Sequence, residues 1–188
     1  MTPKTPLKPA ANATDAIALL VADHKAVKAL FKEYQALAGK GHVPGQKAAL
    51  VARICDELTV HAQVEEEIFY PAVRDAIDDD AALDQATVEH TSARDLIAQL
   101  RAMRPGEDLY DAKVKVLSAY VDHHVIEEET EIFPEARRTG MATQSLGSQM
   151  AARKEELKAQ AEVPGADGYG PPRAKAGNGT RPATKVAR

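Results

Sequence analysis

Cysteine, tryptophan and aromatic residues in general are scarce in this chain. Its 188 residues include one cysteine, Cys55, no tryptophan and only 4% aromatic residues. A single cysteine excludes a disulfide within the chain and a zinc site built from several cysteine thiolates. Extended alternation of β-branched and polar residues is also lacking, while alanine is abundant, so the composition favours helix over sheet. We therefore predict an all-α protein.

Long apolar runs and a marked excess of charge are missing as well. No stretch approaches the ~18 apolar residues that a membrane-spanning helix needs, and the N-terminal sequence MTPKTPLKPAANATDA has no apolar segment typical of a signal peptide. The net charge of -4 gives no indication of nucleic-acid binding. We expect a cytoplasmic protein without a membrane segment or a specific nucleic-acid partner, although a periplasmic protein free of disulfides would have the same composition.

Apolar residues at helical spacing, interrupted by glycine and proline, divide the chain into helices. Residues 1–13 contain three prolines and are expected to form a flexible arm, and Thr14 or Asp15 can cap the first helix. Short breaks then separate four long helices, expected at about residues 14–37, 46–77, 81–103 and 109–138. Short connections favour antiparallel neighbours. Residues 14–138 are therefore predicted to form an up-down four-helix bundle, with kinks where Pro71 and Pro134 fall inside helices.

The sequence beyond the bundle divides into one more helix and a tail. Residues 139–162 have a weaker helical pattern and are expected to add a short fifth helix. Residues 163–188 carry five glycines, four prolines and five Lys or Arg residues against one Asp, a composition typical of disordered segments. The tail is predicted to be disordered. Two roles stay open for the tail: it can keep the protein soluble or contact a protein partner. The sequence also leaves open whether the protein is a monomer or a dimer.

The two halves of the predicted bundle repeat each other. The segment HAQVEEEIFYP, from His61 to Pro71, parallels HHVIEEETEIFP, which ends at Pro134. Aligning the two prolines matches His61 with His124, each followed four residues later by a glutamate. The segments DHKAVKALF and EHTSARDLI likewise place one histidine of the first helix opposite one of the third. The six matched residues are His24, His61, Glu65, His90, His124 and Glu128.

This pattern is typical of a metal centre inside a helical bundle. Residues four apart on a helix lie one above the other, so each His-x-x-x-Glu pair can bind one metal, or its glutamate can bridge two. Six buried polar groups without partners would be very costly in an apolar core, and metal ions offset that cost. Mixed imidazole and carboxylate ligands suit iron or manganese, and zinc stays open. A metal-free bundle with hydrogen-bonded histidines is the alternative.

The stretch YVDHHVIEEETEIFPEA allows two choices of ligand pair by spacing alone. His123 with Glu127 satisfies the same four-residue rule as His124 with Glu128. The match to the first half of the repeat selects His124 and Glu128, which leaves His123 as a flanking residue. The remaining glutamates of the two runs are expected on a solvated face; they are Glu66, Glu67, Glu127, Glu129 and Glu131.

Taken as a set, these histidines and glutamates resemble the hemerythrin family, specifically the HHE cation-binding domain. The resemblance covers about residues 14–138 and implies a four-helix bundle that holds two iron ions, bridged by carboxylates and an oxo or hydroxo group, and that meets O₂ or hydrogen peroxide. Two departures argue against reversible O₂ carriage. Arg94 stands where the oxygen carriers have a fifth histidine, and Glu128 replaces an aspartate at one residue longer spacing. The pattern is similar to the bacterial hemerythrin-like branch, linked with peroxide removal, sensing of iron or oxygen, or stress responses.

Two classes of function follow from this resemblance. One is an enzyme with catalase-like or peroxide-reducing activity, and the other is a module that binds or senses iron or oxygen without turnover. A ferritin-like iron store is disfavoured because no histidine here has a glutamate three residues before it.

Several further side chains have open roles. Arg94 can pair with a carboxylate beside the centre, stabilise an anion, or lie on the rim. His42 is expected in an exposed loop and Cys55 as a small packing residue. Packing is also the simplest role for three tyrosines, although each can donate a hydrogen bond to the centre; they are Tyr34, Tyr70 and Tyr120.

Overall fold

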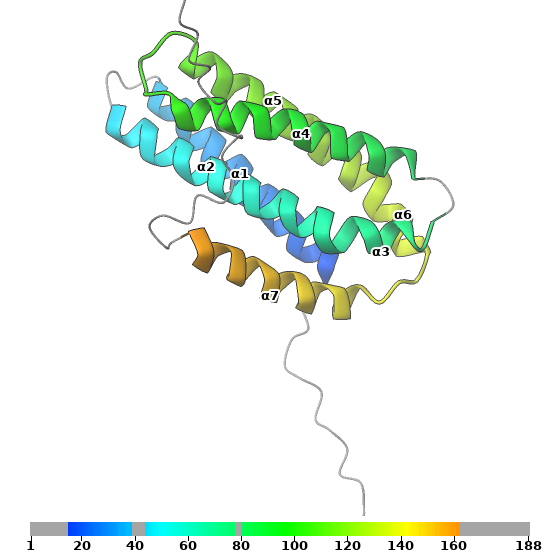
Figure 1. The fold of residues 1–188 in the computed structure, drawn as a ribbon. Coiled ribbons are helices and arrows are strands. Elements are labelled where there is room, and N and C mark those ends of the chain that lie inside the picture. Colours follow the sequence, from blue (N-terminus) through cyan, green and yellow to red (C-terminus); the bar gives the residue numbers. More distant parts are fainter. Residues whose placement is uncertain (1–14, 39–43, 78–79, 162–188) are drawn as a thin grey trace, which may run out of the picture.

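The computed structural model describes residues 15–38, 44–77 and 80–161, and every regular element within these ranges is a helix (Figure 1). The all-α prediction is confirmed. The predicted arm at 1–13, the loop that contains His42 and the predicted tail at 163–188 lie outside the described residues. The four long helical segments begin with α1 (Ala16–Ala38), α2 (Pro44–Val64), α4 (Ala81–Ala102) and α5 (Tyr110–Glu127).

Two of these segments continue through a π-helical turn instead of the simple kink predicted at each proline. Helix α2 passes through η1 (Glu65–Phe69) into α3 (Tyr70–Arg74), and α5 passes through η2 (Glu128–Ile132) into α6 (Phe133–Arg138). The backbone N–H of Tyr70 donates to the carbonyl of Glu65, and that of Phe133 donates to that of Glu128. The next residue is proline in both cases, which has no N–H and crowds the carbonyl four residues earlier. The wider π turn accommodates that loss.

The four segments lie lengthwise against one another as a bundle, and a further helix covers one side (Figure 1). Helix α1 packs on α2, and α4 packs on α5, while α2 with α4 and α1 with α5 join the two pairs. Helix α7 (Thr143–Ala161) lies against α1, α2 and η1 and buries Met150 and Leu157. The predicted fifth helix is therefore present and has 19 residues.

The apolar core has two parts with a polar layer between them. One cluster contains Val27, Ile54 and Leu117, and the other contains Leu20 and Phe69. The six histidines and glutamates matched by the repeat are all buried at the level between the two clusters. On α1, for example, His24 follows Leu20 by one turn and precedes Val27 by one turn, so the same helix face is apolar, then polar, then apolar.

Asp15 caps the first helix and ties three helices together. Its Oδ1 accepts a hydrogen bond from the backbone N–H of Ala18 at 3.0 Å, and its Oδ2 accepts one from the Thr143 hydroxyl at 2.5 Å. The guanidinium of Arg137 lies 3.2 Å from Oδ1. Burial favours the neutral acid, but these three partners outweigh it and lower the pKa of Asp15.

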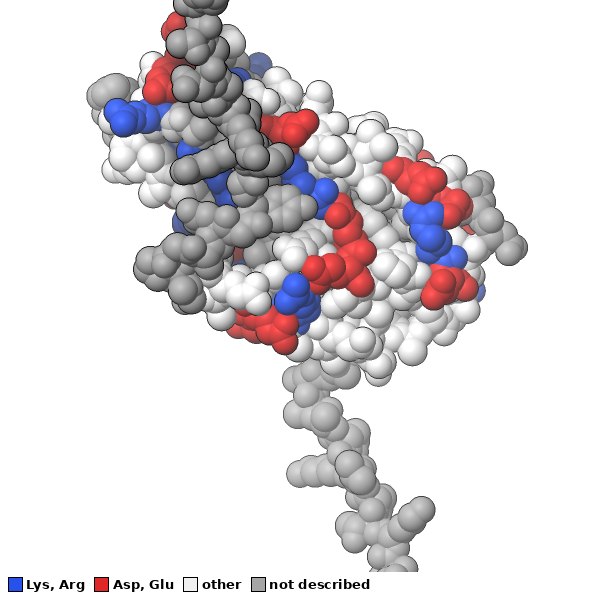
Figure 2. All heavy atoms as spheres, in the orientation of Figure 1, with Lys and Arg blue, Asp and Glu red and all other residues white. Residues whose placement is uncertain are grey.

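Charged side chains of both signs lie next to one another on the face shown in Figure 2. Ion pairs join Arg101 to Asp56 at 2.8 Å and Arg153 to Glu67 at 2.7 Å. In the described part of the chain, the helices are too short or too polar to cross a membrane.

Candidate metal centre

The structure brings all six predicted ligands together in the polar layer of the bundle. Two sets of ligand atoms form, each within 4.8 Å of one another, and the sets share the carboxylate of Glu65. Glu65 and Glu128 are 0% exposed. The first set consists of His24, His61, Glu65 and Glu128, and the second of Glu65, His90 and His124. Their role as ligands remains a prediction.

Each glutamate lies between two imidazoles from different halves of the chain. Glu65 Oε2 is 3.2 Å from His61 Nε2 and 3.5 Å from His90 Nε2. Glu128 Oε2 is 3.1 Å from His24 Nε2 and 3.4 Å from His124 Nε2. Both carboxylates are therefore placed to bridge two cations, because each one lies beside a histidine of each set.

The second ring nitrogen, Nδ1, of each of the four candidate ligand histidines faces a carboxylate. His24 Nδ1 lies 2.9 Å from Glu129 Oε1, and His90 Nδ1 lies 2.8 Å from Glu66 Oε1. The remaining two contacts are His124 Nδ1 to Glu89 Oε2 at 2.9 Å and His61 Nδ1 to Asp23 Oδ2 at 3.6 Å. An ionised carboxylate only accepts, so a neutral imidazole beside one would carry its proton on Nδ1 and leave the lone pair of Nε2 free to bind a cation in the centre. Such carboxylate partners orient histidines that bind metals.

The contacts between these carboxylates and the histidines were not predicted from the sequence. Glu66 and Glu129 were expected on a solvated face. Glu129 is exposed as predicted and Glu66 is only partly exposed, but each also reaches back to a histidine of the other half. Glu127, expected there too, is only half-exposed and accepts hydrogen bonds from Gln85. The repeat does contain a pattern that indicates these partners. Each ligand glutamate is followed by a second glutamate, and an acidic residue precedes both His24 and His90.

Aromatic rings close one side of the centre, and here the two halves differ. Phe133 stacks on His24 with ring centroids 5.7 Å apart, and Tyr70 stacks on His90 at 5.6 Å. The Tyr70 hydroxyl also donates to Glu128 Oε1 at 2.8 Å. Its counterpart Phe133 has no hydroxyl, so the corresponding bond to Glu65 does not exist. The surroundings of the two glutamates therefore differ.

Burial and mutual charge set opposite pKa shifts on the two glutamates. Burial, reinforced by the neighbouring Glu128, raises the pKa of Glu65 well above its usual range. Burial also acts to raise the pKa of Glu128, but contacts with His24 and the charge of His124 outweigh it and lower the value. Burial lowers the pKa of His61 to about 4 and also lowers that of His90. The imidazoles of His61 and His90 are thus favoured in the neutral form that metals bind.

Unpaired atoms in the centre indicate that the donor set fits cations. Within the described ranges, six buried side-chain nitrogen or oxygen atoms have no hydrogen-bond partner. All six belong to the centre: they are His24 Nε2, both ring nitrogens of His61, both carboxylate oxygens of Glu65, and Glu128 Oε2. Buried polar groups are otherwise almost always paired. Two first-row metal ions coordinated by mixed nitrogen and oxygen ligands would satisfy five of these atoms. The sixth, His61 Nδ1, instead faces Asp23 Oδ2 at 3.6 Å.

A cavity of about 200 Å³ adjoins the centre on the side away from the aromatic rings. All four ligand histidines contribute to its wall, and the rest of the wall is mainly apolar, with side chains such as Leu58 and Val121. Tyr120, also on the wall, is 48% exposed, whereas His24 is 1% exposed. The cavity thus leads from the surface to the histidines and has room for a small molecule.

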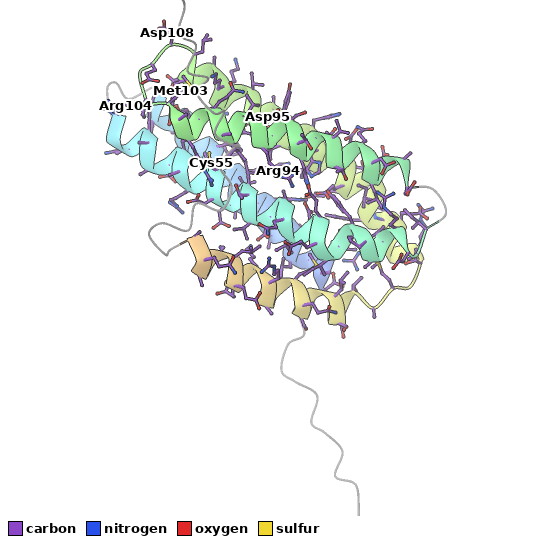
Figure 3. The ribbon with its side chains drawn as sticks, viewed as in Figure 1. Cys55, Arg94, Asp95, Met103, Arg104 and Asp108 are labelled. Atoms are coloured by element: carbon purple, nitrogen blue, oxygen red, sulfur yellow. The ribbon has the colours of Figure 1, made fainter. Side chains whose placement is uncertain are left out.

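The remaining candidates now have defined positions. Arg94 forms an ion pair with Glu66, the carboxylate that holds His90, and Figure 3 shows Arg94 on the side of α4 that faces the α2–η1–α3 segment. Cys55 is buried on α2, and burial raises the pKa of its thiol to about 11, so it is a packing residue. The hydroxyl of Tyr34 donates to Asp111, away from the centre. Of the three tyrosines considered, Tyr70 is the one that bonds to a candidate ligand.

Fold and centre together define a helical-bundle protein with a buried histidine and glutamate site for metal cations. Residues 15–136 match the family model of the hemerythrin HHE cation binding domain, and the chain belongs to this family. The resemblance stated from the sequence is confirmed.

Two known proteins show how far this likeness extends. The crystal structure of a hemerythrin HHE cation binding domain-containing protein, the Rv2633c homolog from Mycobacterium kansasii, aligns with a TM-score of 0.65 and 23% identity. That alignment covers 79% of this chain and 90% of the other, and it shows a shared fold. A DNA nickase from Nostoc sp. is 27% identical over 138 residues, which are 72% of this chain but only 38% of the nickase.

Proposed function

We propose that this protein binds two iron ions between its four histidines and two glutamates and reacts there with hydrogen peroxide or O₂. The observation that supports this most strongly is the convergence of six unpaired buried atoms on one layer of the bundle. Iron is favoured by the mixed imidazole and carboxylate donors, with manganese and zinc as the competing occupants. The cavity of about 200 Å³ supplies access for a small molecule.

Bound iron would supply the electron transfer that such chemistry requires. The chain's own residues position and protect it. Glu66, Glu89 and Glu129 form hydrogen bonds with Nδ1 of three of the histidines, and Asp23 lies 3.6 Å from Nδ1 of His61, which keeps each Nε2 directed inward. The mainly apolar cavity wall favours small uncharged molecules over larger polar ones. Arg94 is engaged with Glu66 in the position where oxygen carriers place a further histidine, and this favours peroxide removal over reversible O₂ carriage.

Metal analysis combined with optical spectroscopy tests this proposal. The purified chain, loaded with ferrous ion, is expected to contain two irons, to absorb in the near ultraviolet and visible range, and to release O₂ from added hydrogen peroxide. Glu65→Gln should lose most of the bound iron and the activity. The matched variant Glu67→Gln should retain both, because Glu67 points outward to Arg153. Failure of the wild-type chain to retain iron would refute the centre, and inertness of the loaded chain towards peroxide would refute the enzymatic part.

A sensing role is a second candidate, and one contact favours it. Asp23, which faces His61 in the centre, forms an ion pair with Lys154 on α7. A change in the charge around His61 can therefore reach the last described helix. Limited proteolysis near the C-terminus, compared with and without bound iron, tests this role, and identical cleavage in both states would argue against it. Replacing Lys154 by Met should abolish any difference that is found.

DNA cleavage is not part of this proposal. The part of the Nostoc nickase that aligns with this chain is 38% of that protein. On the face shown in Figure 2, acidic and basic side chains lie side by side, which does not favour a polyanion.

A further inference from the structure

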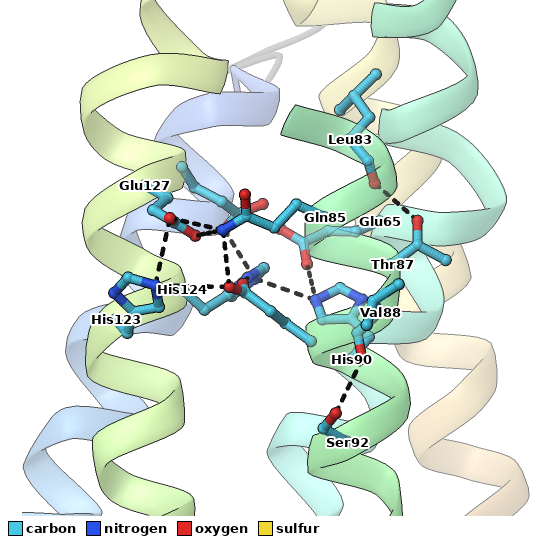
Figure 4. A network of polar contacts seen from close by, with 12 residues as sticks. Glu65, Leu83, Gln85, Thr87, Val88, His90, Ser92, His123, His124 and Glu127 are labelled. Carbon is cyan, nitrogen blue, oxygen red and sulfur yellow. Dashed lines mark hydrogen bonds and ion pairs between the residues drawn. The ribbon is translucent and has the colours of Figure 1, made fainter. Parts of the chain in front are cut away.

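A second group of possible metal ligands lies on the surface beside the inner centre. His123 and Glu127 on α5 and Glu89 on α4 place one ligand atom each within 4.8 Å of one another. His123 Nε2 is 3.3 Å from Glu127 Oε1 (Figure 4). It is 3.7 Å from Glu89 Oε1. This is the alternative His-x-x-x-Glu pair of the sequence. The same stretch of α5 therefore presents one such pair inward and a second one outward.

The two carboxylates of this group are held in place by neighbours that are not part of it. The side-chain amide of Gln85 donates to both oxygens of Glu127, at 2.7 and 2.9 Å (Figure 4). The same amide nitrogen lies 3.2 Å from Glu89 Oε1. The other oxygen of Glu89 accepts a hydrogen bond from His124 Nδ1 at 2.9 Å. Carboxylates that are fixed before a cation arrives lose little freedom on binding it, which is the condition for a preorganised site.

The imidazole of His123 completes the group and is open to solvent. Its side chain is 64% exposed, and its Nε2 faces the same two glutamates. One imidazole and two carboxylates at this spacing leave room for water ligands, a donor set that divalent iron, zinc and manganese accept.

The position of the group connects it with the inner centre. Glu89 faces His123 with one oxygen and the inner ligand His124 with the other. Glu89 and His123 also belong to the wall of the same cavity that reaches all four inner histidines. His123 stands at the exposed part of that wall and His24 at its buried end. A cation bound by the surface group would therefore be separated from the inner ligand His124 by the carboxylate of Glu89.

We propose that His123, Glu127 and Glu89 form a surface site for one divalent first-row metal ion, and that this site supplies cations to the inner centre. The supply role rests on the proposed function, whereas the existence of the surface site does not.

Zinc titration of the full-length, iron-loaded protein tests the surface site. Calorimetry under anaerobic conditions is expected to show one further zinc ion per chain. His123→Ala and Glu127→Gln should each weaken this binding at least tenfold. Glu131→Gln, an exposed carboxylate on the same segment, should leave it unchanged. Circular dichroism of each variant confirms that the bundle is intact. Absence of a further zinc ion in the wild type, or unchanged binding in both site variants, would overturn the proposal.

The rate of iron uptake tests the supply role separately. Metal-free protein is mixed with limiting ferrous ion, and filling of the inner centre is followed by its absorbance. We expect His123→Ala to fill several times more slowly than the wild type or Glu131→Gln, yet to reach the same final iron content. Equal rates would refute the supply role. Failure of the wild type to take up two irons would instead count against the proposed function. In that case, the comparison of zinc binding by the metal-free wild type and His123→Ala would still decide whether the surface site exists.

Discussion

Tyr70 is the residue that distinguishes the two halves of the centre. Its hydroxyl donates to Glu128, while Phe133 at the equivalent position offers only a ring. We expect Tyr70→Phe to lower iron affinity about tenfold or more, since partners that bind a ligand carboxylate tune its affinity for metal. Competition against a chromophoric chelator measures this. Tyr34→Phe is the control, because it removes a hydroxyl bonded to Asp111 far from the centre and should leave iron affinity unchanged.

Glu66 and Glu129 make the same contact in opposite halves, so they permit a paired test. Each accepts a hydrogen bond from the Nδ1 of a ligand histidine, His90 and His24 respectively. Glu66→Gln and Glu129→Gln should each reduce iron affinity about 10-fold to 100-fold, a range typical of lost carboxylate partners of metal-binding histidines. Glu67→Gln should have no such effect. Equal iron affinity in all three variants would show that these contacts do not orient the histidines.

The π turns explain how one helix face holds both a ligand and the aromatic wall beside it. In η1 and the residue after it, Glu65, Phe69 and Tyr70 are all buried, and in the second half Glu128, Ile132 and Phe133 are buried at the same spacing. A regular α-helix would turn one member of each adjacent pair towards the surface. The two bulges therefore direct two consecutive side chains inward at the centre, as π turns often do at functional sites.

The cap at Asp15 leads to a prediction about helix stability and pH. Asp15→Ala removes the bonds to Ala18, Thr143 and Arg137 and should lower the free energy of unfolding by about 1 kcal/mol at pH 7. The folded state lowers the pKa of Asp15 below its ordinary 3.8, so this contribution is complete above that value and is lost as pH falls through the folded-state pKa.

Urea unfolding of the wild type and Asp15→Ala at pH 7 and pH 3 measures the effect. The stability difference between the two chains should shrink at pH 3. Asp95→Ala, which removes an exposed carboxylate on α4, should not destabilise the chain at pH 7. A difference that stays constant between the two pH values would show that the charge of Asp15 does not contribute.

Metal removal is expected to destabilise the whole bundle. The centre joins both halves of the chain, and without cations six of its buried atoms lack partners. A cation present at about 1,000 times its dissociation constant stabilises the folded state by about 4 kcal/mol, which for a protein of this size corresponds to a shift in Tm of roughly 10 °C. Calorimetry before and after chelation measures that shift. Glu65→Gln should show a much smaller shift in Tm on chelation. An equal shift in the wild type and the variant would contradict a role for the centre in stability.

The fold was largely predictable because its periodic signals are local. Apolar spacing and Gly or Pro breaks placed the long helices within a few residues, and short connections indicated antiparallel neighbours. The π turns were not predicted, because a proline inside a helix signals an irregularity without specifying its geometry. The contact of α7 with α1 and α2 was not predicted either, since a weakly amphipathic helix does not indicate which surface it covers.

The six candidate ligands followed from the sequence because repeat and helix period together define which residues share a face. The partners of those ligands did not, because they join residues of different helices. Glu66 reaches His90 and Glu129 reaches His24 only after the two halves pack together. His123 and His124 illustrate the difference between what the sequence predicts and what the packing of helices decides. Spacing left both open and the repeat selected His124, but burial of one ring and exposure of the other depend on how α5 packs against α4.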